Sequence, residues 1–212
     1  MKTLQQILIE SAALLDLTAA LPTGVELATR SSYANQALAE AANTGILNEF
    51  KVPVTTFATT ATISLGADFK EFINEPAVMT SGGSWEDYEQ ITPEEARDKG
   101  LTDKYCYVTG NPSSGYTAYF NNLATGATIS YVKHRYPSGM ATLTSICELN
   151  DPQYIVLKTS AYVLKSRGDE RFPIIDSDAE VRLRNMFARQ QRRPLGGNQQ
   201  VRRTGAANYS LS

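Results

Sequence analysis

The chain has 212 residues, and its 20 Lys and Arg nearly balance its 22 Asp and Glu. With 42% hydrophobic residues it is too apolar for wholesale disorder, and its length fits one domain or one domain with an appendage. The near-zero net charge argues against a generic nucleic-acid coat protein. The charge is nevertheless polarised, because residues 182–212 hold seven Arg and no Asp, Glu or Lys, whereas residues 1–181 hold 13 basic and 22 acidic side chains.

The cysteine count and the apolar segments narrow the class of protein further. Cys106 and Cys147 are too few for a disulfide scaffold or a four-Cys zinc site. Both lie in strand-like runs, which favours buried free thiols over a disulfide. Residues 1–15 lack the unbroken apolar segment of a signal peptide, and no stretch approaches the roughly 20 apolar residues of a membrane span. We therefore expect no membrane partner and a protein that begins in a reducing cytoplasm.

The first fifty residues have the periodicity of two helices. Apolar residues at helical spacing predict a helix over 3–20, which Pro22 ends. A second helix is expected over 25–49, with Thr23 and Glu26 as a capping box at its start.

The pattern changes to period two after Pro53. Residues 54–65 are predicted as one strand, in which Phe57, Ile63 and Leu65 share a face. Residues 68–72 are expected to form a helical turn. A polar, acidic stretch over 81–103 follows, in which Thr92 and Pro93 open a short helix. Further strands are predicted over 104–109, 117–120 and 127–135, the first two joined as a hairpin.

Helical periodicity returns at Asp151 and Pro152, which predict a helix to Arg167. A second helix should follow Pro173 and run to about residue 192. The remaining residues are polar and basic without period, so we expect them to be extended when alone. The order of elements predicts the α+β class: a four-helix bundle from the N- and C-terminal segments, an inserted antiparallel β-domain and an extended C-terminal arm. The expected parts are residues 1–50, 51–150, 151–193 and 194–212.

The sequence offers no convincing catalytic, metal or cofactor site. His134 has no nucleophile or further metal ligands at a useful spacing, so a structural or solvent-facing role is expected. The acidic residues of the polar stretch indicate a solvated face rather than a metal or glycosidase cluster; they are Glu86, Asp87, Glu89, Glu94, Glu95 and Asp98. The glycines of 81–84 and 196–197 lack the context of a phosphate-binding loop. We predict that the protein is not an enzyme and needs no cofactor.

Two further patterns allow more than one interpretation. Six tyrosines in and next to the predicted strands could form a base-stacking platform on a sheet. A sheet or interface lining is favoured because few basic residues accompany them. They are Tyr105, Tyr107, Tyr116, Tyr119, Tyr131 and Tyr136. The Arg pairs at 192–193 and 202–203 are compatible with contacts to nucleic acid or to an acidic protein groove.

The sequential plan of the chain resembles that of the head-to-tail adaptor (connector) proteins of tailed bacteriophages, the group that includes podovirus tail tubular protein A. The resemblance covers a helix pair with Arg30, a strand ending in residues 63–69, a β-rich middle, the helix after Asp151 and the basic C-terminus. Residues 65–69 look like the family's Leu-Pro-x-Asp-Phe segment, with Gly66 where Pro is usual.

The resemblance implies a structural virion protein at the head–tail junction, assembled in the host cytoplasm. It would form a ring, commonly of twelve copies, that binds the portal protein on one side and a tail-side tube, nozzle or stopper protein on the other. Genomic DNA would pass through the bore without sequence recognition. The portal-binding arm would use Arg192, Arg193, Leu195, Val201, Arg202, Arg203, Tyr209 and Leu211. A nucleic-acid-binding protein that uses the Arg-rich tail, or another neck or tail completion protein, is the alternative.

Overall fold

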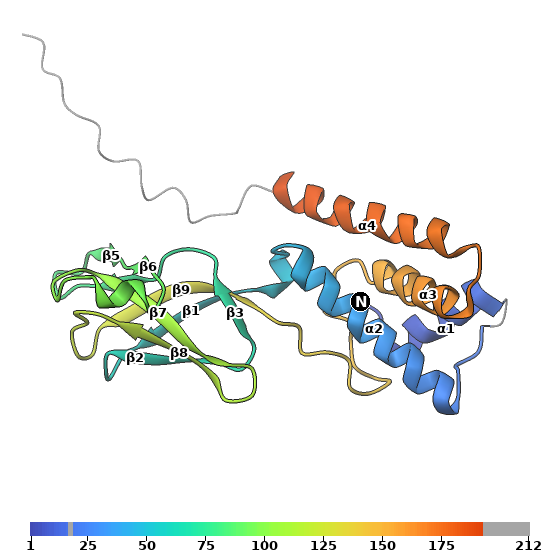
Figure 1. Cartoon of the computed structure of the whole chain (residues 1–212), viewed down its shortest axis with the longest axis horizontal. Coiled ribbons are helices and arrows are strands. Elements are labelled where there is room, and N and C mark those ends of the chain that lie inside the picture. Colours follow the sequence, from blue (N-terminus) through green and yellow to red (C-terminus); the bar gives the residue numbers. More distant parts are fainter. Residues whose placement is uncertain (17–18, 193–212) are drawn as a thin grey trace, which may run out of the picture.

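The computed structural model describes residues 1–16 and 19–192. Two parts lie end to end along the longest axis of the molecule (Figure 1). We call the part made by the described residues of 1–50 and by 136–192 the helical unit, and residues 51–135 the β-unit. The chain enters the β-unit at Lys51, after a short 3₁₀ turn over Asn48–Phe50, and returns after Arg135.

The helical unit contains four α-helices. They are α1 (Leu4–Asp16), α2 (Gly24–Thr44), α3 (Gln153–Arg167) and α4 (Phe172–Arg192). The loop between the β-unit and α3 also belongs to this unit, because Met140, Cys147 and Leu149 are buried in the helical core. This loop is tied to the N-terminus, where the Leu4 N–H donates to the Ser145 carbonyl at 2.9 Å.

The α+β class is as predicted, but the four-helix bundle is wrong. Helix α3 lies at the centre, and α1, α2 and α4 each pack against it. The reason lies in the sequence of α3, which has apolar or small residues on all sides rather than in one stripe, so that the helix is buried nearly all round. Its buried residues include Tyr154, Val156, Ser160 and Val163.

The β-unit consists of two packed sheets. The strands are β1 (Lys51–Phe57), β2 (Thr62–Gly66), β3 (Phe69–Phe72), β4 (Ala77–Met79), β5 (Trp85–Asp87), β6 (Glu89–Gln90), β7 (Tyr105–Asn111), β8 (Gly115–Phe120) and β9 (Thr128–Arg135). One sheet has the order β1-β9-β4-β5, with β3 also paired to β9, and the other has the order β2-β8-β7-β6. The pairs are antiparallel except β6 and β7, which are parallel, a departure from the antiparallel domain that we expected.

Alternate residues of both sheets meet in a second hydrophobic core. Ile129 and Tyr131 of β9 face Cys106, Ala118 and other residues of the second sheet. Aromatic rings close this core, since the ring centroids of Phe72 and Tyr131 lie 5.2 Å apart in an edge-on arrangement. Each unit therefore has its own core.

The predicted strand over 54–65 is two strands in different sheets. Strand β1 ends at Phe57 and β2 begins at Thr62, so the alternation before and after the turn does not refer to the same face. Ile63 and Leu65 are buried as expected, whereas the Phe57 side chain is 73% exposed.

Three other segments also differ from their predicted local structure. Residues 69–72 form strand β3 rather than a helical turn, because both of its phenylalanines are needed in the core between the sheets. Thr23 precedes α2 but makes no side-chain capping hydrogen bond, because Glu26 turns to Arg30 and Arg167 instead. The helices expected over 3–20 and 25–49 are shorter, since α1 ends at Asp16 and α2 at Thr44.

Candidate interaction surfaces

His134 is a buried residue of the junction between the two units. It is on β9, fully inaccessible to solvent, and its Nδ1 lies 2.9 Å from Glu71 Oε1. Its ring centroid is 6.4 Å from that of Phe50, where the chain leaves the helical unit. Its Nε2 is buried and has no hydrogen-bond partner among the described residues. The position fits a structural histidine that supports the junction.

The acidic residues of the 81–103 stretch are dispersed over the surface. Glu89 pairs with Lys99 at 2.7 Å, and Glu86 pairs with Lys104. Glu95 accepts the Thr92 N–H at 2.7 Å, and its own N–H is 3.2 Å from the Thr92 hydroxyl, so this predicted cap is present. No group of three or more His, Cys, Asp or Glu residues within the described part of the chain could hold a metal ion.

The two cysteines are buried and free. Burial raises the pKa of the Cys106 thiol to about 12, so this group is protonated at neutral pH. Cys147 lies in the other unit, in the helical core, and burial likewise raises its pKa. Both behave as small core residues, as the sequence indicated.

The tyrosines of the strands do not form one platform. Tyr131 is buried and Tyr116 partly buried in the core between the sheets, and Tyr105 is buried with its hydroxyl 3.4 Å from the Ala96 carbonyl. Tyr107 and Tyr119 pair across β7 and β8 on the outer face, where their rings stack at 5.1 Å. Only this pair resembles a stacking surface.

Polar contacts fix the two units to each other. The Lys70 ammonium of β3 donates to the Ala42 carbonyl at the end of α2 at 2.8 Å. Arg135, the last residue of β9, pairs with Glu148 at 2.9 Å. Each of these bonds joins a residue of the β-unit to a residue of the helical unit, so the two units are held in a defined relative position.

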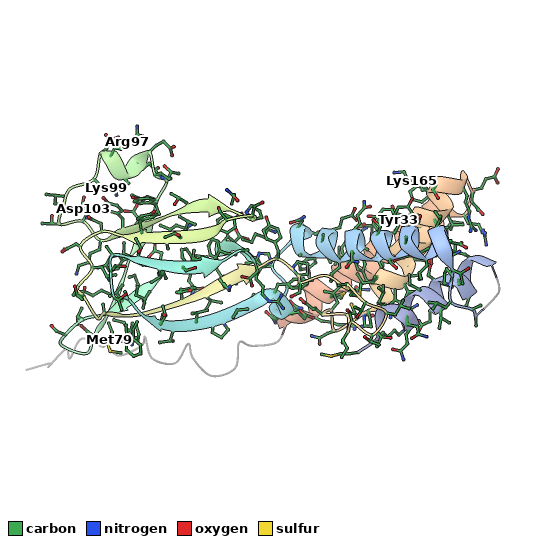
Figure 2. The ribbon with its side chains drawn as sticks, turned by 90° about the horizontal axis from the view of Figure 1, so that it is seen from below. Tyr33, Met79, Arg97, Lys99, Asp103 and Lys165 are labelled. Atoms are coloured by element: carbon green, nitrogen blue, oxygen red, sulfur yellow. The ribbon has the colours of Figure 1, made fainter. Side chains whose placement is uncertain are left out.

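The outer end of the β-unit exposes an apolar row. Cross-strand pairing sets Phe57 beside Thr128, Thr128 beside Met79 and Met79 beside Trp85, all on the outer face of the sheet. Phe57 is 73% and Trp85 41% exposed. Figure 2 shows Met79 on one side of this end, with Arg97, Lys99 and Asp103 on the other side.

The helical unit contains a buried cation at the contact of three helices. Lys158 of α3 donates to Asp176 and Glu180 of α4 at 2.8 and 2.7 Å, and Glu40 of α2 lies 3.9 Å away. Burial by itself would lower the pKa of Lys158, but the hydrogen bonds to Asp176 and Glu180 raise it overall. The ammonium is therefore protonated at neutral pH and holds α4 to α3.

Helix α4 ends at the junction of the two units. The Gln190 side chain accepts the Asn48 N–H at 2.8 Å and donates to Glu49 at 2.6 Å. A hollow of about 380 Å³ beside this contact is lined by both Glu49 and Arg189. Of the predicted arm residues, the structure places only the backbone of Arg192, the last residue of α4. The others lie outside the described residues: Arg193, Leu195, Val201, Arg202, Arg203, Tyr209 and Leu211.

The comparisons with known proteins identify no family. The sequence matches no protein-family model, and it has no significant match to a curated protein. Within the described residues, no helix combines the length and the apolar character required to cross a membrane.

Proposed function

We propose that the protein is a structural ring adaptor of a tailed-phage virion, which joins the portal to the tail and lets DNA pass. The two-ended build of the molecule supports this proposal. Each end has its own hydrophobic core, and polar contacts such as that between Lys70 and Ala42 fix the two ends to each other. A part that connects two different neighbours needs such a rigid body with two separate surfaces.

The position of the arm is compatible with this function. Residues 193–212 follow directly on α4, whose end is anchored beside Asn48 by Gln190. They contain three Arg and no acidic side chain. In the proposed ring, these residues reach the portal, where Arg side chains pair with acidic groups and Leu195 and Val201 fill apolar pockets. Each exposed ion pair contributes only about 0–1 kcal/mol, so firm attachment requires many arms acting together.

The charge of the body suits the passage of DNA. Residues 1–181 are acidic overall, and a bore that bound phosphate tightly would slow transit. We therefore expect the bore not to be electropositive.

Cryo-electron microscopy of the purified protein, alone and mixed with portal, tests the proposal. We expect a ring on the portal for the full chain, and a folded protein that fails to dock after deletion of residues 194–212. A monomer even in the presence of portal would contradict ring formation, and equal docking of the truncated chain would contradict the role of the arm. Strong, salt-dependent binding of free DNA would instead favour the nucleic-acid-binding alternative.

A further inference from the structure

The outward face of α4 carries an apolar stripe that no described part of the chain covers. Ile174, Val181 and Ala188 follow one another at intervals of seven residues and so share one side of the helix. The side chains of Ile174 and Val181 are 65% and 48% exposed. The opposite side of the helix, with Ala179 and Leu183, is buried against the core. Single exposed apolar residues are common on protein surfaces, so a contact is inferred from the charges beside this stripe.

The charges of α4 are separated along its length. The first half holds Asp176, Asp178 and Glu180, and every charged residue of the second half is Arg: Arg182, Arg184, Arg189 and Arg192. Asp178 and Arg189 have no ion pair with another described residue. Asp176 and Glu180 are bound by Lys158 of α3, so Asp178 is the acidic residue of α4 that remains for a partner. An identical helix in antiparallel orientation would place this Asp178 beside the basic half of the first helix, and the two helix dipoles would also oppose each other favourably.

A hollow lies on the flank of the stripe where these charges are found. It has a volume of about 300 Å³ and is lined by Asp151, Leu157, Asp178, Val181, Arg182, Asn185 and Arg189. Asp151 is already bound by Arg182 at 2.9 Å. Arg189 is the remaining cation of the hollow, and it can receive a carboxylate from outside.

We propose that α4 is a self-association surface, on which a second copy of this chain docks its own α4 antiparallel about a two-fold axis at Val181. The spacing of the residues supports this axis. Ile174 and Ala188 are each seven residues from Val181, so the large side chain of one copy meets the small one of the other. Side chains of a helix lean towards its N-terminus, so Asp178 of one copy and Arg189 of the other lean towards each other at the hollow.

The contact is small, and the dimer is correspondingly weak. One pair of helices covers less than the roughly 1,600 Å² of a standard interface, so association should depend on concentration in the micromolar range. A two-fold contact cannot repeat around a single cyclic ring, in which successive subunits contact each other through different surfaces. The inference is therefore independent of the proposed function.

Charge exchange between the two positions provides the test, with sedimentation of the full-length protein over a range of concentrations as the measurement. We expect the unaltered protein to form a dimer. Asp178→Arg alone and Arg189→Asp alone each place like charges together twice per dimer and should weaken association about tenfold. A mixture of these two variants restores opposite charges at both contacts, so a mixed dimer should form about as well as the original.

The control is Asp98→Arg, which makes the same charge change at an exposed position of the β-unit. It should leave association unchanged, and circular dichroism should show that all variants are folded. The proposal is wrong if the unaltered protein remains a monomer throughout, if the single variants associate as well as the original, or if their mixture shows no recovery.

Discussion

Replacing Lys158 with Met should destabilise the protein and loosen α4. The Lys158 side chain is only 9% exposed, and it is the shared partner of Asp176 and Glu180. Removal of one member of a fully buried ion pair costs about 3–5 kcal/mol. The two carboxylates are 30% and 41% exposed, so water can solvate them after the change. We therefore expect a loss of about 2 kcal/mol in the free energy of unfolding.

Urea unfolding followed by circular dichroism measures this loss, and two further variants make the result specific. Lys165→Met removes a Lys from the exposed side of the same helix, where the ammonium lies 5.6 Å from the Phe172 ring centroid. This control should lose less than about 1 kcal/mol. Adding Asp176→Asn and Glu180→Gln to Lys158→Met removes the uncompensated charges and should recover much of the stability.

Two outcomes would contradict this role of Lys158. If Lys158→Met and Lys165→Met have the same free energy of unfolding, the ammonium does not hold α4. If Lys158→Met is destabilised but the triple variant is no better, the loss comes from packing of the lysine stem and not from unpaired carboxylates.

Three other predictions concern the β7–β8 hairpin, the loop between the β-unit and α3, and the response to acid. Gly110 has φ +124°, and an added Cβ would lie 2.2 Å from the Gly115 carbonyl oxygen on the facing strand. Gly110→Ala should therefore lower the free energy of unfolding, measured in urea, by more than about 2 kcal/mol. A loss of less than about 1 kcal/mol would show that the turn can relax. The Asn35 side chain accepts a hydrogen bond from the Met140 N–H at 2.6 Å and donates one to the Met140 carbonyl at 3.2 Å. Asn35→Ala should lower the free energy of unfolding by about 1–3 kcal/mol and speed hydrogen exchange of the Met140 amide. Unchanged exchange would show that Asn35 does not protect this amide. Hydrogen bonds from Arg171 lower the pKa of Asp169 to about 2. The resulting stabilisation is present above the ordinary carboxyl pKa and is lost as pH falls towards 2, so the difference in melting temperature between the original protein and Asp169→Asn should shrink over that interval. A constant difference would show that protonation of Asp169 is not coupled to folding.

The helices and the hairpin could be predicted because their signals are local. Asp151 and Pro152 mark the start of α3, and the turn at 110–115 lies between two runs of alternating residues, where β7 and β8 form. The capping pair Thr92 and Glu95 is also contained within four residues. In each of these cases, neighbouring residues determine the conformation.

The sequence-based predictions were wrong where residues distant in the sequence determine the local structure. The run over 54–65 alternates without interruption, but the chain crosses from one sheet to the other at the turn after Phe57. This crossing is set by the pairing of β2 with β8, which the local sequence does not show. Glu26 has a capping spacing with Thr23 but finds Arg167 on another helix. The central position of α3 depends on three other helices, and the Lys158 cluster was missed because its acidic partners lie 18 and 22 residues further along the chain.

The contrast between β1 and α4 bears on how copies of this chain could meet. Among the described residues, strand β1 pairs only with β9 and so forms an edge of its sheet, which is the usual place for strand addition. The Ala58 N–H donates to the Ala127 carbonyl, and because bonding alternates along an antiparallel ladder, the nitrogen of Pro53 faces away from β9. A proline at that position has no N–H to offer, which protects the edge against pairing with another strand. Within the part of the chain that the structure describes, α4 carries no comparable protection, since Ile174 and Val181 are exposed near Asp178 and Arg189. Pro53 thus disfavours strand addition at β1, whereas the outward face of α4 offers the surface that the proposed two-fold pairing would use.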